Sequence, residues 1–101
     1  MNPRYQKAFT LLQASQANAS LARLMALQQA SQARLKAIEH LIPSALRPNV
    51  LSGPLENDVW CLLLSNNTTC AKLRQLLPEF EACLRRNDLA VKSIRLKVSR
   101  Q

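Results

Sequence analysis

The side chains best suited to catalysis in this chain are one histidine, three cysteines and six carboxylates. His40 directly follows Glu39, so on a helix their side chains point in different directions and cannot pair as a base and its orienting acid. The carboxylates are scattered, with no pair spaced for acid and base roles. They are Glu39, Glu56, Asp58, Glu79, Glu81 and Asp88. We therefore predict that the chain is not an enzyme and has no catalytic residues.

Metal and nucleotide chemistry lack the necessary residue patterns as well. Cys61, Cys70 and Cys83 do not have the Cys-x-x-Cys spacing of zinc sites, and only His40 could add an imidazole. We predict no metal site, and we interpret the thiols as small apolar side chains in or near the core. Gly53 is the only glycine, whereas phosphate-binding loops need several. We therefore expect no cofactor and no small-molecule substrate.

The chemistry that remains is electrostatic. Fourteen Lys and Arg residues against six Asp and Glu give a formal net charge of +8. This balance favours polyanionic partners, with nucleic acid first among them. Ribosomal proteins and proteins of membrane surfaces share it, so the charge predicts a class of partner and no reaction.

The N-terminal part of the chain reads as helical. Asn2 and Pro3 form a good helix start, but residues 13–20 are a mixture of Ala, Gln and Ser with little to bury. We expect residues 1–20 to be a helical or frayed extension, followed by a single domain over residues 21–101. A second helix follows, with an apolar stripe that is interrupted by polar Gln28 and Ser31. The stripe contains Leu21, Leu24, Leu35, Ile38 and Ile42.

The C-terminal part alternates between strand and helix patterns. Pro43 should end the second helix near Leu41, and apolar runs at 50–55 and 59–65 predict two antiparallel strands joined at 56–58. Gly53-Pro54 places the first strand at an edge or marks a bulge. Residues 70–84 repeat at helical spacing, although Pro78 should kink or split that helix.

A final strand completes the predicted fold. Ile94, Leu96 and Val98 alternate with polar side chains, as in a half-buried strand. The order predicts an α+β fold, in which N-terminal helices precede a β-β-α-β three-stranded sheet with helices on one face. The other face of the sheet should be exposed to solvent. Trp60 shares the parity of Leu62 and Leu64, so we place it in the core and not on the surface.

Residues 41–98 resemble the DciA family in the order and spacing of their motifs. The matching pieces are Leu41-Ile-Pro, Leu62-Leu-Leu-Ser-Asn-Asn, Cys70-Ala-Lys-Leu-Arg-Gln-Leu-Leu-Pro-Glu-Phe and Val91-Lys-Ser-Ile-Arg-Leu-Lys-Val. The resemblance implies a fold similar to K-homology domains. It also implies an ATP-independent loader or activator of the bacterial replicative helicase (DnaB type) that has DNA affinity of its own. Many relatives carry Trp where this chain has Thr69. Larger relatives also carry a disordered tail, whose contacts we expect here to be missing or moved to residues 1–20.

Basic side chains are the candidate DNA contacts. Arg95 and Lys97 share the predicted solvent face of the last strand and could follow a phosphate backbone, although such charges also keep an edge strand soluble. Arg100 follows just past that strand. The remaining candidates lie on two lines of the core helix, Lys72 with Arg86 and Arg74 with Arg85, and there a solvated helix face is the favoured interpretation. The full set is Arg95, Lys97, Arg100, Lys72, Arg74, Arg85 and Arg86. The sequence assigns no helicase-binding residue.

The predicted partners are therefore the replicative helicase and single- or double-stranded DNA. A K-homology-like RNA- or ribosome-associated module is the alternative, although the Gly-x-x-Gly clamp of such domains is missing. A purely structural helical bundle is a third reading, against which the polar Gln28 and Ser31 argue. The longest apolar runs fall far short of the roughly 20 residues that cross a membrane. The N-terminus lacks the pattern of a secretory signal, so we expect a cytoplasmic protein.

Overall fold

The computed structural model describes the backbone of residues 3–99 and the side chains of residues 20–99. Helix α1 (Pro3–Ile38) leads into two short 3-10 helices (Glu39–Leu41 and Ser44–Asn49). Strands β1 (Val50–Glu56) and β2 (Val59–Leu64), helix α2 (Asn67–Arg86) and strand β3 (Ser93–Val98) follow. The predicted α+β class and the β-β-α-β order are confirmed. Within the described residues, no helix is long and apolar enough to cross a membrane.

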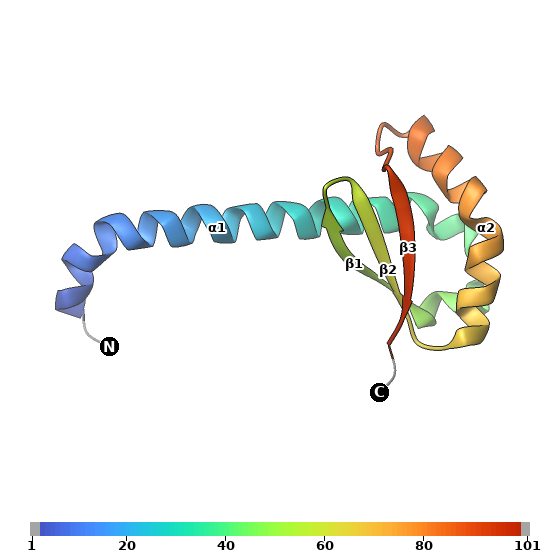
Figure 1. Ribbon diagram of the computed structural model, residues 1–101, viewed down its shortest axis with the longest axis horizontal. Helices are drawn as coiled ribbons and strands as arrows, with labels where there is room; N and C mark the ends of the chain where they lie inside the picture. Colours follow the sequence, from blue (N-terminus) through green and yellow to red (C-terminus); the bar gives the residue numbers. More distant parts are fainter. Residues whose placement is uncertain (1–2, 100–101) are drawn as a thin grey trace.

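The sheet is mixed and three-stranded, in the order β1-β2-β3. β1 pairs with β2 in antiparallel fashion through a tight hairpin. β3 pairs with β2 in parallel, because α2 carries the chain back along the sheet before β3 begins. Figure 1 shows α1 passing behind β1 while α2 lies beside β3. Both helices cover the same face, and no described element covers the opposite face of the sheet.

The core forms between this helix layer and the sheet. Trp60, Leu62 and Leu64 alternate along β2 and point into it, where they meet Phe80 and other apolar side chains of α2. Trp60 and Phe80 are both fully buried, which confirms that they belong to the core. Fully burying a side chain of this size contributes roughly 1.5–3 kcal/mol, so this layer supplies much of the stability of the domain.

The hairpin and the bulge of β1 follow from local chemistry. Asn57 and Asp58 have φ angles of 52° and 65°, which is the left-handed pair that a two-residue hairpin turn requires and that Asn and Asp tolerate. Two residues of β1, Gly53 and Pro54, stand opposite Cys61 alone, so the register shifts between Ser52 and Leu55. A Cβ on Gly53 would lie 2.9 Å from the carbonyl oxygen of Cys61. The predicted bulge is confirmed, and its first residue must be glycine.

Helix α2 is continuous through Pro78, so of the two predicted outcomes, a kink or a split, the split is wrong. The helix starts where the Asn66 side chain accepts the N–H of Thr69 at 2.8 Å. Pro78 is exposed, and its ring costs one hydrogen bond. Phe80, Cys83 and Leu84, which follow it, are buried. Cys70 and Leu73, before the proline, are buried as well, so both halves of the helix pack into the core.

The N-terminal segment is one 36-residue helix and not two. The predicted stripe is buried at Ile38 and Ile42, but Leu21 and Leu24 are 55% and 62% exposed. The N-terminal part of α1 projects beyond the sheet (Figure 1), and Leu24, which lines a hollow beside β1, is left largely open to solvent. The helix is continuous through Ser20, and the proposed domain boundary there stays a prediction.

Candidate nucleic-acid interface

The open face of the sheet brings two of the candidate cations together. The register of the parallel pair sets Arg95 beside Cys61 and Lys97 beside Leu63. Both cations are exposed. Ile94, the residue before Arg95, points into the core and is buried. The prediction that Arg95 and Lys97 share one solvent face is confirmed. At about 3.3 Å per residue, their Cα atoms lie roughly 6.6 Å apart along the strand.

That spacing suits a nucleic-acid backbone. One strand of B-DNA advances about 3.4 Å along the helix axis per phosphate, which is less than the separation of the two cations. Each side chain can therefore face a different phosphate of the same strand. Contacts of this kind position a nucleic acid without reading its sequence.

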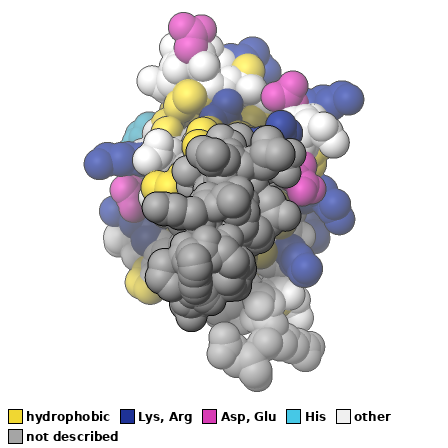
Figure 2. Space-filling view, turned by 90° about the vertical axis from the view of Figure 1, so that its left-hand side faces the viewer, with side chains coloured by type: hydrophobic (Ala, Val, Ile, Leu, Met, Phe, Trp, Pro, Cys, Tyr) yellow, Lys and Arg dark blue, Asp and Glu magenta, His cyan; other side chains and the backbone are white. Residues whose placement is uncertain are grey.

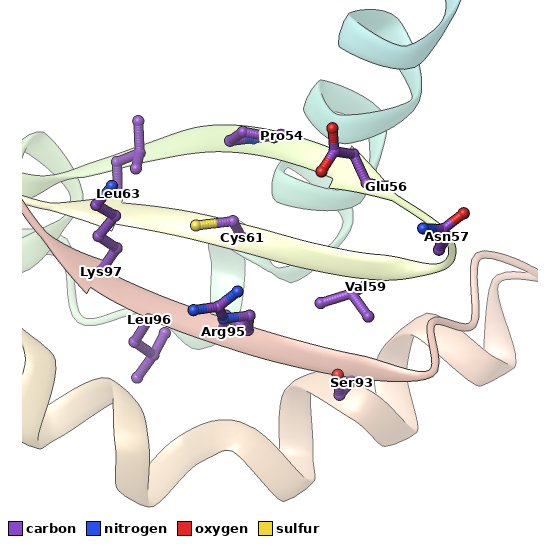
Figure 3. A pocket seen from close by; sticks show the side chains of 10 residues that line it. All are labelled: Pro54, Glu56, Asn57, Val59, Cys61, Leu63, Ser93, Arg95, Leu96 and Lys97. Carbon is purple, nitrogen blue, oxygen red and sulfur yellow. The ribbon is translucent and has the colours of Figure 1, made fainter.

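A shallow depression of about 810 Å³ lies on this face. Its floor is formed by Val59, Cys61 and Leu63 of β2, which are half-buried. Figure 3 shows Arg95 and Lys97 rising from β3 on one side, and Glu56 on β1 at the hairpin end. The depression is thus bordered by two cations and one carboxylate.

The apolar floor corrects one prediction. The open face is wet along β3, but its centre on β2 is apolar, and Leu51 of β1 adds a side chain that is 64% exposed. The signal was present in the sequence, because the run Val59–Leu64 contains no polar residue at either parity. Such an unbroken run is typical of a strand with apolar side chains on both faces.

The cations of α2 lie on two opposite sides of that helix. The Cys83 thiol donates to the carbonyl oxygen of Ala37 at 3.3 Å, which fixes the side of α2 that faces α1. At about 100° per residue, Lys72 and Arg86 fall near that side. Arg74 and Arg85 fall on the opposite side, away from α1.

The candidate set is therefore divided over three surfaces. Arg95 and Lys97 are on the open sheet face, and each side of α2 carries two of the others. Arg100 lies outside the described residues. Figure 2, which views the molecule from the side of the projecting α1, shows dark blue Lys and Arg side chains around the rim with magenta acidic ones between them.

Lys92 is a further cation near β3. If the alternation of the strand extended back to it, its side chain would point into the core with Ile94 and Leu96. It is exposed, and its backbone N–H donates to the carbonyl of Asp58 at 2.7 Å, just before β3 begins. The strand proper starts at Ser93, so the alternation does not apply to Lys92. Lys92 therefore adds a third exposed cation just before β3, which itself carries Arg95 and Lys97.

Among the described residues, no aromatic side chain is exposed on the open face to stack on a base. Trp60 and Phe80 are fully buried, and the side chains of Tyr5 and Phe9 lie outside the described residues. The Trp60 indole is occupied by a hydrogen bond to Ser31. Thr69 is also fully buried, and its hydroxyl accepts the Asn49 side-chain amide at 3.3 Å. Binding at this face would depend on charge and not on base stacking.

The thiols and carboxylates do not assemble into a metal centre among residues 20–99. Cys70 and Cys83 are buried, as predicted for core thiols, whereas Cys61 is half-buried on the open face. Comparisons of the chain with protein-family models, with curated proteins and with solved structures gave no match.

Proposed function

We propose that this protein is a non-enzymatic DNA-binding adaptor that assists the loading or activation of a DnaB-type replicative helicase. The observation that supports it most directly is the pair Arg95 and Lys97, exposed side by side on the sheet face that no described helix covers. The net charge of +8 supplies the long-range attraction. The resemblance of residues 41–98 to the DciA family supports the helicase as partner and a K-homology-like version of the fold.

The proposed DNA contact is electrostatic. Arg95 and Lys97 would each neutralise one phosphate and release the counterions condensed there. The flat, apolar centre of the open face offers no donors or acceptors that could read base edges. We therefore propose binding without sequence preference, in which the protein holds DNA by its backbone. A role in replication would place the protein in the cytoplasm.

The helicase role is tested with the full chain and the purified replicative helicase of the same organism. Gel filtration of the mixture at low and at moderate salt should show both proteins eluting earlier than either alone. Loading of the helicase onto DNA should increase when the protein is added, without any ATP hydrolysis by the protein itself. No complex at either salt, together with unchanged loading, would exclude this role.

The alternative is an RNA- or ribosome-associated module, which the basic balance and a K-homology-like layout would also suit. The only glycine is occupied by the bulge of β1, where a Cβ would meet Cys61. It is therefore not available for the clamp by which ordinary K-homology domains hold RNA. Competition between single-stranded DNA and structured RNA for the same protein decides between the two functions. Preferential retention of the RNA would favour the alternative.

A further inference from the structure

We propose that the free edge of β3 binds an extended acidic segment of a partner protein, which adds to the sheet as a fourth strand. β3 is the last strand in the order β1-β2-β3. No strand of the described chain pairs with its outer side. This inference goes beyond DNA binding, because it concerns the backbone of β3 and a protein ligand.

The hydrogen bonds of the sheet show which backbone groups of β3 are unpaired. The N–H of Ser99 donates to the carbonyl of Leu64 at 2.8 Å, and the N–H of Ser65 donates to Asn49 at 3.0 Å. Backbone groups of Leu64 therefore face β3, and those of Ser65 face β1. Since these directions alternate along each strand, Arg95 and Lys97 point their backbone groups at β2.

The residues of the other parity point outward. Ile94, Leu96 and Val98 each present one N–H donor and one C=O acceptor at the free edge. An added strand pairs with such a row through its own backbone, as in other complexes formed by strand addition. A nucleic-acid backbone carries acceptors and no matching donors, so this row selects a polypeptide.

Charge selects the kind of polypeptide. Lys92, Arg95 and Lys97 are exposed at and just before β3, and Arg74 and Arg85 add positive charge on the side of α2 that faces away from α1. A second copy of β3 would bring like charges opposite one another, which destabilises strand pairing. An acidic strand would instead meet Arg95 and Lys97 on the open face.

The two faces of the edge also define a pattern within that segment. Arg95 and Lys97 lie on the open face, while Leu96 points the other way, toward α2 (Figure 3). Leu96 and Val98 are only half-buried, so apolar side chains of an added strand would cover them. The expected ligand therefore alternates acidic and apolar residues.

Amide hydrogen exchange measured by NMR on the full chain tests this directly. The probe is a synthetic peptide of alternating Glu and Val, and the control is the same pattern with Lys in place of Glu. The acidic peptide should slow exchange at Ile94, Leu96 and Val98 about tenfold or more, as an added hydrogen bond requires. Arg95 and Lys97, whose amides already bond to β2, should change little. The proposal is overturned if the acidic peptide does not bind at low salt. It is also overturned if the peptide binds without slowing exchange selectively at Ile94, Leu96 and Val98.

A pair of variants separates this site from DNA binding. Val98→Pro removes an outward donor and leaves the ladder to β2 intact, whereas Val98→Ala keeps the donor. Loss of one backbone hydrogen bond should weaken the acidic peptide by about tenfold in the Pro variant and much less in the Ala variant. DNA affinity should be equal in both. Equal peptide affinity in the two folded variants contradicts the proposal, and if the Pro variant does not fold, the exchange pattern of the wild type decides.

Discussion

The indole N–H of Trp60 donates to the hydroxyl of Ser31 at 2.8 Å, and that hydroxyl donates to the carbonyl of Gly53 at 2.7 Å. One serine thereby joins α1, the central strand and the bulge of β1. Ser31 is only 2% exposed, and a buried donor or acceptor left unpaired is costly. The polar interruption of the apolar stripe of α1 is thus a structural contact between helix and sheet.

Replacing this serine should destabilise the fold. Ser31→Ala leaves the Trp60 N–H and the Gly53 carbonyl without partners, at roughly 1–3 kcal/mol for a buried unsatisfied group. We expect a fall of about 2–3 kcal/mol in the free energy of unfolding, measured by urea titration. Ser44→Ala, which removes a hydroxyl from an exposed position, should change it by less than about 0.5 kcal/mol. Equal stabilities of the two variants would show that the bridge contributes nothing.

The bulge should tolerate no side chain at its first position. Gly53→Ala would put a Cβ 2.9 Å from the Cys61 carbonyl oxygen and 3.1 Å from Cγ of Leu63. We expect a loss of about 1–3 kcal/mol, in the range of overpacked sites. Thermal unfolding measures it, with Pro54→Ala at the neighbouring exposed residue as the control. A Tm for Gly53→Ala at or above that of the wild type would contradict the close approach.

The proline in α2 should be a net cost to stability. Pro78 is exposed in the middle of the helix, and alanine would restore the missing backbone hydrogen bond. We expect Pro78→Ala to raise the free energy of unfolding by about 1–3 kcal/mol. Gln75→Ala, one turn earlier on the exposed side, should change it by no more than about 0.5 kcal/mol. A destabilised Pro78→Ala variant would mean that the packing of α2 depends on the ring.

The pair Arg95→Glu and Lys97→Glu should weaken DNA binding while leaving the fold intact, because both side chains are exposed. Fluorescence anisotropy with a labelled oligonucleotide measures the affinity. The matched control is Arg23→Glu with Lys36→Glu, two exposed cations of α1 with the same change of net charge. A general effect of charge would weaken both double variants equally. That result would move the DNA site away from the open sheet face.

The salt dependence counts the phosphates that these side chains contact. Arg95→Gln with Lys97→Gln should reduce the slope of log affinity against log salt by about 1.8 for duplex DNA, or about 1.4 for single strands. Circular dichroism checks that the fold is retained. A slope identical to that of the wild type would show that neither side chain meets a phosphate.

The elements with local signals were predictable from the sequence. Asn57-Asp58 predicted the hairpin turn, and Gly53-Pro54 predicted the bulge. The alternation from Ile94 to Val98 predicted the last strand and its exposed cations. Each of these depends on neighbours in the chain, through backbone geometry or a fixed period. The two lines of cations on α2 were predictable for the same reason.

The features that depend on distant residues were not predictable. The stripe of α1 indicates which side is apolar, but not where the sheet stops, so it does not reveal that Leu21 and Leu24 stay exposed. Ser31 reads as an interruption until Trp60 and Gly53 are placed beside it. The continuity of α2 through Pro78 likewise depends on how Phe80 packs, and tertiary contacts override local propensity in such cases.

The strand order also has a consequence for how the chain folds. β2 pairs on one side with the strand just before it and on the other with a strand that lies beyond the whole of α2. Closing the short hairpin costs little chain entropy, whereas docking β3 requires the long connection to be organised first. We therefore expect β3 to be the last strand acquired during folding and the first released by partial opening. The cations that it carries would then be arranged only in molecules whose folding is complete.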